Sequence, residues 1–338
     1  MKPDLQSFCQ QGDEIRLILN RLAEGKMMHA SLITGEKGTG KRTLASLIAS
    51  AVLCSSDGNR PCGICRDCRM ASEMKHPDLV LIQKGTPLSR DGKKDRNNIP
   101  VDDIREMIRI VNTRTFDGNS RVVLIYDADK MTPQAQNCLL KTLEEPPDST
   151  YLILVTEHPE MLLVTIMSRC VPIRLKSWPD SYIIRILHEH GIQGTRATMS
   201  VSQANGSIGK ALELASDEEY WKLRDEVKKE FLETSDRGMI ISIASGWKDR
   251  KSEFGRLLEI LETMLTHMVY IRETRSDEQS ADEFPENWQR FTKNADLKRF
   301  IRLSDAIGDA RKQYQANVNI QAVMEQLLFV FMGEGNEW

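Results

Sequence analysis

A glycine-rich turn between an apolar run and a helix-forming segment constrains this fold more than any other feature. The turn, 35-GEKGTGKR-42, follows the apolar residues 31–34 and precedes the helical pattern of 43–53. Such a turn aims backbone N–H groups at an anion, and a lysine at its end adds a charge for a phosphate. The spacing predicts a strand, a phosphate-binding loop and a helix. The candidate nucleotide-binding residues of this loop are Gly35, Gly38, Gly40 and Lys41.

The same loop departs from the pattern of a hydrolytic site. After the lysine, a P-loop needs serine or threonine to hold Mg²⁺, and this chain has Arg42. Thr43 is no substitute, because the next helical position points about 100° away. An Asp-Glu pair is also required at the end of a neighbouring strand. Either Tyr126 replaces its metal-binding Asp, or Asp127 takes that place and Ala128 replaces the Glu. Both alternatives predict lost hydrolysis, and they leave ATP or ADP binding open.

Four more short apolar runs alternate with helical segments in the first half of the chain. They lie at 79–83, 121–126, 151–155 and 171–175. Short and almost wholly apolar strands separated by helices are typical of a parallel sheet that is covered on both faces. Only helical patterns follow residue 178. The predicted fold class is therefore α/β with a parallel sheet, followed by helical regions.

This change of pattern also indicates domain boundaries. We expect an α/β domain at 1–178, a small helical domain at 179–216 and an all-α domain at 217–338. Two polar stretches, 84–98 and 273–286, are expected to be loops.

Four of the seven cysteines form a cluster with the spacing C-x7-C-x2-C-x2-C. Four thiolates so close together suit tetrahedral Zn²⁺, at about 2.3 Å per bond. The polar residues between them argue against four free buried thiols. Because four protein ligands leave no open coordination position, the predicted zinc site is structural rather than catalytic. Its ligands would be Cys54, Cys62, Cys65 and Cys68.

The net charge of −3 excludes a strongly basic chain whose whole surface binds nucleic acid, so any DNA contact must come from a local patch or from partner chains. The longest apolar runs, such as 327–332, are far shorter than the roughly 20 residues of a membrane span. Residues 1–14 lack the apolar core of a signal peptide. We therefore expect a cytoplasmic protein with no membrane contact.

Further motifs carry a resemblance to a known family. They are 75-KHPDLVLI-82, 139-LLKTLEEPP-147 and 168-SRC-170, downstream of the four-cysteine insertion that follows the P-loop helix. Over residues 10–215 the chain resembles the subunits of the bacterial replicative clamp loader, which are AAA+ proteins. The motor subunits, gamma and tau, have an intact P-loop, whereas delta-prime subunits of DNA polymerase III tolerate degenerate versions. The departures at the phosphate loop therefore favour the delta-prime family.

The resemblance implies a RecA-like AAA+ domain with a zinc module inserted at 54–68, a small helical lid and a helical collar for oligomerisation. The collar would join five subunits in a hetero-oligomeric, pentameric ring. This chain would be a non-hydrolysing stator beside the clamp-loader subunits gamma, tau and delta. The complex would load the beta sliding clamp on primer-template DNA in an ATP-dependent reaction.

The resemblance also implies roles for two basic residues. Arg169, in the SRC triplet, would reach the ATP site of the next subunit as an arginine finger. Lys210, in 206-GSIGK-210, would contact a nucleotide phosphate. From the residues alone, Arg169 is equally compatible with capping the end of a helix before the run 171–175.

Two other functions compete with the stator. An active gamma- or tau-type ATPase would have to hold Mg²⁺ in spite of Arg42 and Tyr126. A zinc-containing nucleic-acid-binding module without a ring would run as a monomer in the presence of loader subunits and bind DNA with its own salt dependence.

Overall fold

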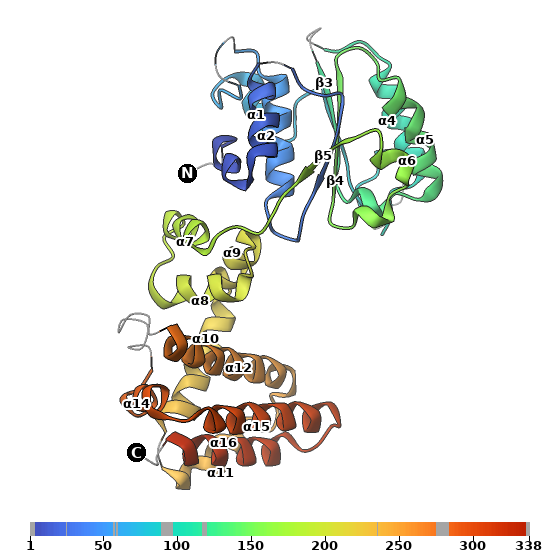
Figure 1. The fold of residues 1–338 in the computed structure, drawn as a ribbon. Helices are drawn as coiled ribbons and strands as arrows, with labels where there is room; N and C mark the ends of the chain where they lie inside the picture. The colour runs from blue at the N-terminus through green and yellow to red at the C-terminus, as the bar shows by residue number, and fades with distance from the viewer. Residues whose placement is uncertain are drawn as a thin grey trace. The chain divides into compact units, whose positions relative to one another are not determined.

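The computed structural model describes residues 4–24, 26–56, 58, 60–88, 97–116, 120–234, 236–274 and 284–335 (Figure 1). The chain divides into two compact units, Met1–Glu213 and Leu214–Trp338. The three-domain division expected from the sequence stays a prediction. Much of the two expected loops, at 89–96 and 275–283, lies outside the described residues. Among the described helices, none combines the length and apolar character that a membrane crossing requires.

The first unit is built on a five-stranded sheet with the order β2-β3-β4-β1-β5, in which every pairing is parallel. All five strands form where the apolar runs predict them, and the α/β class is confirmed. The three interior strands are buried almost throughout, because helices cover both faces of the sheet. Their bounds are β1 Ala30–Thr34, β2 Leu79–Ile82, β3 Arg121–Ile125, β4 Thr150–Thr156 and β5 Val171–Arg174.

Helices α1 and α2 cover one face of the sheet, and α4, α5 and α6 cover the other (Figure 1). The helix α5 begins at Pro133, and Thr132 Oγ1 accepts a hydrogen bond from Ala135 N at 3.2 Å, as a helix N-cap does. The helices of this part are η1 Gln6–Gln11, α1 Asp13–Ala23, α2 Lys41–Leu53, α3 Arg66–Ser72, α4 Val101–Val111, η2 Ala128–Lys130, α5 Pro133–Glu144, η3 Pro159–Met161 and α6 Val164–Met167.

After β5 the chain is helical. The helices α7 Asp180–Glu189, α8 Gly194–Ala204 and α9 Ile208–Ser216 occupy the segment where a small helical unit is expected. The start of α9 packs directly on the glycine-rich loop, since Gly209 N donates to Gly38 O at 2.9 Å. This part of the first unit therefore helps to shape the candidate site.

The second unit is all-α, as predicted. Its core is aromatic, with Trp247, Trp288, Phe231, Phe254 and Phe291 among the largest fully buried side chains. Helix α12 contributes buried apolar side chains at helical spacing, among them Leu257, Leu258 and Leu261. The described elements are α10 Glu218–Lys228, a π-helical turn η4 Lys229–Glu233, η5 Arg237–Met239, α11 Ile240–Gly246, α12 Lys251–Thr274, α14 Glu286–Asn294, α15 Leu297–Gln315 and α16 Ile320–Gly335.

Candidate functional site

A cavity of about 940 Å³ lies at the edge of the sheet where the strands end, here called the carboxyl edge. The glycine-rich loop follows β1, Asp127 follows β3, and Glu157 follows β4. Because these three strands are neighbours and run parallel, the loops at their ends converge on one place. Gly38, Gly40 and Lys41 line the cavity, as expected of candidate nucleotide-binding residues.

Two other predicted residues lie elsewhere. Gly35 packs against the chain after β5, where an added Cβ would stand 2.7 Å from Leu175 O. Lys210 is exposed, and it is not among the described residues that line the cavity. Its backbone N–H donates to Ser207 Oγ at 3.1 Å. The proposed contact of Lys210 with a phosphate stays a prediction.

Hydrogen bonds to its backbone carbonyl groups fix the glycine-rich loop in place. The carbonyl groups of residues 37–39 accept hydrogen bonds of 2.9 Å from Ser207 Oγ, Gly209 N and Trp178 Nε1. Gly38 has a φ of +78°, and a Cβ there would stand 2.2 Å from Ser207 Oγ. Only glycine therefore allows this close approach of the loop and the start of α9.

Lys41 is buried, with only 6% of its side chain exposed. Its Nζ donates to Glu36 O at 2.7 Å and forms an ion pair with Glu157 Oε1 at 3.2 Å. The charge that a P-loop offers to phosphate is thus partnered inside the chain.

Arg42 lies where a hydrolytic P-loop has its metal-binding hydroxyl. Its Nη2 donates to both carboxylate oxygens of Asp127 at 2.9 Å, and its guanidinium lies 5.0 Å from the centre of the Tyr126 ring. Burial raises the pKa of Tyr126 to about 12, although Arg42 opposes this. The phenol is therefore neutral at neutral pH and cannot act as the carboxylate that it replaces. In the alternative in which Asp127 is the metal-binding acid, it is bonded to Arg42 instead.

Sequence reasoning missed Asp129, a third side chain at this strand end. The 3-10 turn η2 brings it back to the sheet, where its carboxylate accepts from Thr156 Oγ1 at 2.7 Å and pairs with Lys130 Nζ at 3.0 Å. Burial opposes ionisation, but these two hydrogen bonds outweigh it and lower the pKa of Asp129. The sequence 127-DAD-129 directly follows an apolar run, so its second Asp could have been predicted to lie near the strand end. Glu157 was missed too, although it follows a strand that was predicted.

Arg169 lies at the opposite edge of the sheet, here called the amino edge, just before β5 begins. Its guanidinium forms an ion pair with Glu144, the last residue of α5, and donates to Thr165 O at 2.8 Å. The side chain remains 33% exposed. The contact with Thr165 is what a helix cap makes. Because the cavity opens at the other edge, Arg169 is not placed to serve the cavity of its own chain.

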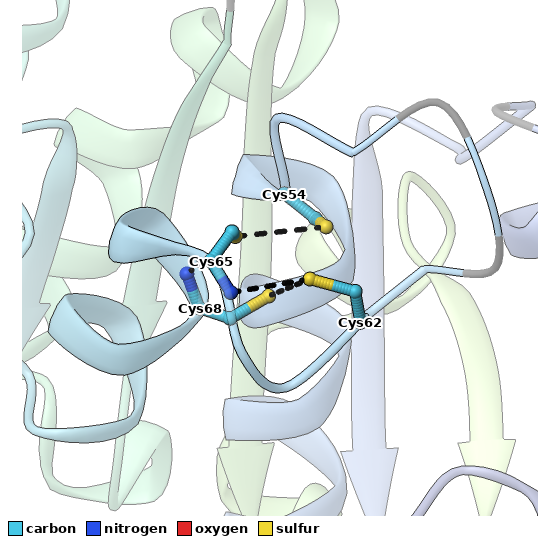
Figure 2. A group of neighbouring side chains, drawn as sticks. All are labelled: Cys54, Cys62, Cys65 and Cys68. Atoms are coloured by element: carbon cyan, nitrogen blue, oxygen red, sulfur yellow. Dashed lines mark hydrogen bonds between the residues drawn. The ribbon is translucent and has the colours of Figure 1, made fainter.

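The four clustered cysteines meet at one point (Figure 2). All four Sγ atoms lie within 4.8 Å of one another, with 3.9 Å between Cys54 and Cys65 and 4.0 Å between Cys62 and Cys68. A regular tetrahedron with metal–sulfur bonds of 2.3 Å has sulfur–sulfur edges of about 3.8 Å. The donor set and its size therefore fit a zinc ion.

Backbone hydrogen bonds favour the thiolate forms that bind metal. Cys65 N donates to Cys62 Sγ, and Cys68 N donates to Cys65 Sγ, both at 3.3 Å. The first bond lowers the pKa of Cys62. Burial raises the pKa of Cys65, but its hydrogen bonds outweigh this and lower it to about 6. Burial raises the pKa of Cys68. A cation among the four sulfurs would offset that penalty.

Comparison with known proteins gives a consistent family. The family model described as "DNA polymerase III, delta subunit" matches residues 10–179. The Bacillus subtilis DNA polymerase III subunit delta' is 27% identical over 323 residues, which cover 94% of each chain. The Escherichia coli subunit delta' is 33% identical over 60% of this chain and 58% of its own length. The Salmonella typhimurium subunit tau is 32% identical over 58% of this chain and 30% of its own length.

Solved structures give weaker likenesses. A gamma subunit-related protein of DNA polymerase III from Thermotoga maritima has a TM-score of 0.40 at 18% identity, over 94% of this chain and all of its own. The RuvB Holliday junction branch migration motor of the same organism has a TM-score of 0.44 at 17% identity, over 67% of each chain. Family membership therefore rests on sequence. The match of the family model to half of the chain, together with the delta' relative that covers 94% of it, shows that this chain belongs to the delta-prime family of DNA polymerase III subunits.

Proposed function

We propose that this chain is a clamp-loader subunit that does not hydrolyse ATP and supplies Arg169 to the ATP site of a neighbouring subunit. The ion pair between Arg42 and Asp127 carries this proposal. Hydrolysis in a P-loop site needs Mg²⁺ held between the residue after the lysine and a strand-end acid. In this chain Arg42, which follows the lysine, forms an ion pair with the strand-end Asp127.

The placement of Arg169 supports action on another subunit. It lies at the amino edge of the sheet, whereas the cavity lies at the carboxyl edge. Glu144 holds the side chain at the end of α5 in the isolated chain. In a ring, a neighbour's phosphate would compete with Glu144 for the same guanidinium. An arginine supplied in trans can be worth about 10³–10⁵ in rate.

The proposed partners follow from the family. The relatives are named as delta' and tau subunits of DNA polymerase III. We place this chain in a hetero-pentameric ring with gamma or tau and delta, with the second unit as the collar that joins the subunits. The ring would load the beta sliding clamp on primer-template DNA. This chain would brace the motor subunits.

The cysteine cluster has a structural part in this proposal. Cys54, Cys62, Cys65 and Cys68 would hold Zn²⁺, which would tie the end of α2 to α3 and leave no position open for chemistry.

The experiment compares ATP turnover in rings reconstituted with purified gamma or tau, delta and this chain, with the beta clamp and primed DNA present. With Mg²⁺, the chain alone should show no turnover. Arg169→Ala should lower hydrolysis at the neighbouring site by about 10³-fold or more. The ring should then retain only the turnover of its other sites.

Arg174→Ala is the matched control, because Arg174 is an exposed arginine at the far end of β5. This variant should leave turnover unchanged. Steady hydrolysis by the chain alone would identify an active gamma- or tau-type ATPase instead. Unchanged ring turnover in Arg169→Ala would contradict the finger.

A further inference from the structure

We propose that the cavity at the carboxyl edge binds a nucleoside di- or triphosphate without a divalent cation, with the Arg42 guanidinium in the place of magnesium. The proposal deepens the proposed function and rests on it in one respect, namely that the site does not hydrolyse its ligand. The bound nucleotide would then be a ligand that this chain does not hydrolyse.

The charges around the cavity favour a strongly anionic ligand. Among the residues that the structure describes, ten charged side chains line it, six basic and four acidic. Three of the acids, Asp127, Asp129 and Glu157, are bonded to basic residues of the same site. A nucleotide without its metal carries more negative charge than its magnesium complex, so it is the better electrostatic match. The basic residues are Lys37, Lys41, Arg42, Lys84, Lys130 and Arg185.

Arg42 is suited to replace a metal because its charge is permanent and its donors are several. A guanidinium has five N–H donors and stays protonated at any relevant pH. Among the described residues, the hydrogen bonds of its side chain involve Nη2 alone, and both go to Asp127. Nε and Nη1 are left to meet phosphate oxygens. The side chain is 56% exposed and lines the cavity, so it can adjust to a ligand.

The acids that could attract a metal are already neutralised. Asp127 has Arg42 on both oxygens. Asp129, whose side chain is 5% exposed, is bonded to Thr156 and Lys130. A magnesium ion would therefore meet a resident cation and no unpaired carboxylate at this strand end.

Lys41 supplies the second charge. Its present partner Glu157 has a side chain that is 41% exposed, so it can turn into water at small cost when a phosphate takes its place. Aromatic side chains also line the cavity beside the glycine-rich loop, with Trp178 and Tyr182 stacked at 4.3 Å and Phe8 packed edge-on against Trp178 at 5.6 Å. An apolar wall beside a basic one suits a base joined to a polyphosphate.

The test measures the binding of fluorescently labelled ADP and ATP to the full chain by anisotropy, in EDTA and in Mg²⁺. The wild-type chain should bind equally well or more tightly in EDTA. Arg42→Ala should weaken binding in EDTA by about tenfold or more, because a charge-assisted hydrogen bond is lost. Arg42→Ser should make binding depend on Mg²⁺, since a hydroxyl would again face Asp127. Arg174→Ala should bind as the wild type does, and far-UV circular dichroism should confirm that each variant is folded.

Two results would overturn the inference: wild-type binding that disappears in EDTA, and failure of ADP and ATP to bind at millimolar concentration. Tripolyphosphate that competes as well as ADP would overturn the nucleoside part, and a much weaker competition supports it. None of these outcomes affects the Arg169 experiment, which measures hydrolysis at a neighbour's site. Conversely, an inactive finger would leave metal-independent binding standing.

Discussion

The cavity and the cysteine cluster lie in the same unit of the molecule, yet they satisfy their charges in opposite ways. In the cavity, Lys41, Arg42 and Asp129 each have a partner of opposite sign within the chain. In the cluster, four sulfur atoms face one another, and backbone N–H groups donate to two of them. Several charged groups of the cavity are therefore already paired within the chain, whereas the four sulfur atoms of the cluster have the arrangement that a metal ion would complete.

Because of this difference, we expect the two sites to respond differently when one of their residues is replaced. An exposed ion pair such as Arg42 with Asp127 contributes little to stability, because solvent replaces the partner when one of the two is removed. A structural metal site loses much of its binding free energy when one ligand is removed, and with it the folding free energy to which metal binding is coupled. The predictions below test this contrast, in order of decreasing effect.

Cys65→Ser should have the largest effect. Structural zinc sites in small domains contribute about 10 kcal/mol or more at pH 7, and removal of one thiolate should release the ion and expose the segment 54–68 to proteolysis. Metal content by elemental analysis, together with the thermal midpoint, measures the change. The control is Cys138→Ser, which removes a thiol outside the cluster and should leave the metal bound. If the wild-type chain is purified without metal, is stably folded and has four freely titrating thiols, the assignment of a structural zinc ion is wrong.

Gly38→Ala should have an intermediate effect on the cavity side. The new Cβ would collide with Ser207 Oγ, and φ at this position is +78°, so we expect a loss of about 1–3 kcal/mol in the free energy of unfolding. Urea titration measures it. Gly308→Ala, in α15 with open space around it, is the control and should be neutral or stabilising by up to about 1 kcal/mol. Equal stability of the two variants would show that the loop is not held by close packing.

Arg42→Ala should have the smallest effect on stability. The pair with Asp127 is exposed, and exposed pairs contribute about 0–1 kcal/mol. The same urea titration should therefore give nearly the wild-type free energy of unfolding, even though nucleotide binding falls. A loss of several kcal/mol would mean that the pair is part of the fold rather than a place for a ligand, and the contrast with the zinc cluster would disappear.

Much of the fold follows from local pattern. Each strand of the sheet forms where a short apolar run occurs, and α5 starts at Pro133, directly after its N-cap Thr132. The cysteine cluster was also predictable, because its ligands lie within one short segment whose turns bring them together. In these cases the interactions that matter join residues close in the chain.

The partners of the charged residues were not predictable in the same way. Arg42 meets Asp127 across 85 positions, Thr156 meets Asp129 across 27, and Arg169 meets Glu144 across 25. The sequence suggested that hydrolysis is lost, but it could not indicate that the two altered positions bond to each other.

The alternation of strands and helices, the glycine-rich loop and the four-thiol cluster could all be predicted from the amino-acid sequence. Each depends on residues that lie close together in the chain. The order of the strands in the sheet came from the tertiary structure, and it shows which strand ends are neighbours. The ion pair of Arg42 with Asp127, the hydrogen bond of Asp129 with Thr156 and the distance of Arg169 from the cavity all follow from that order. The physical reason is that these contacts depend on the strand order β2-β3-β4-β1-β5, which is set by the packing of the whole sheet.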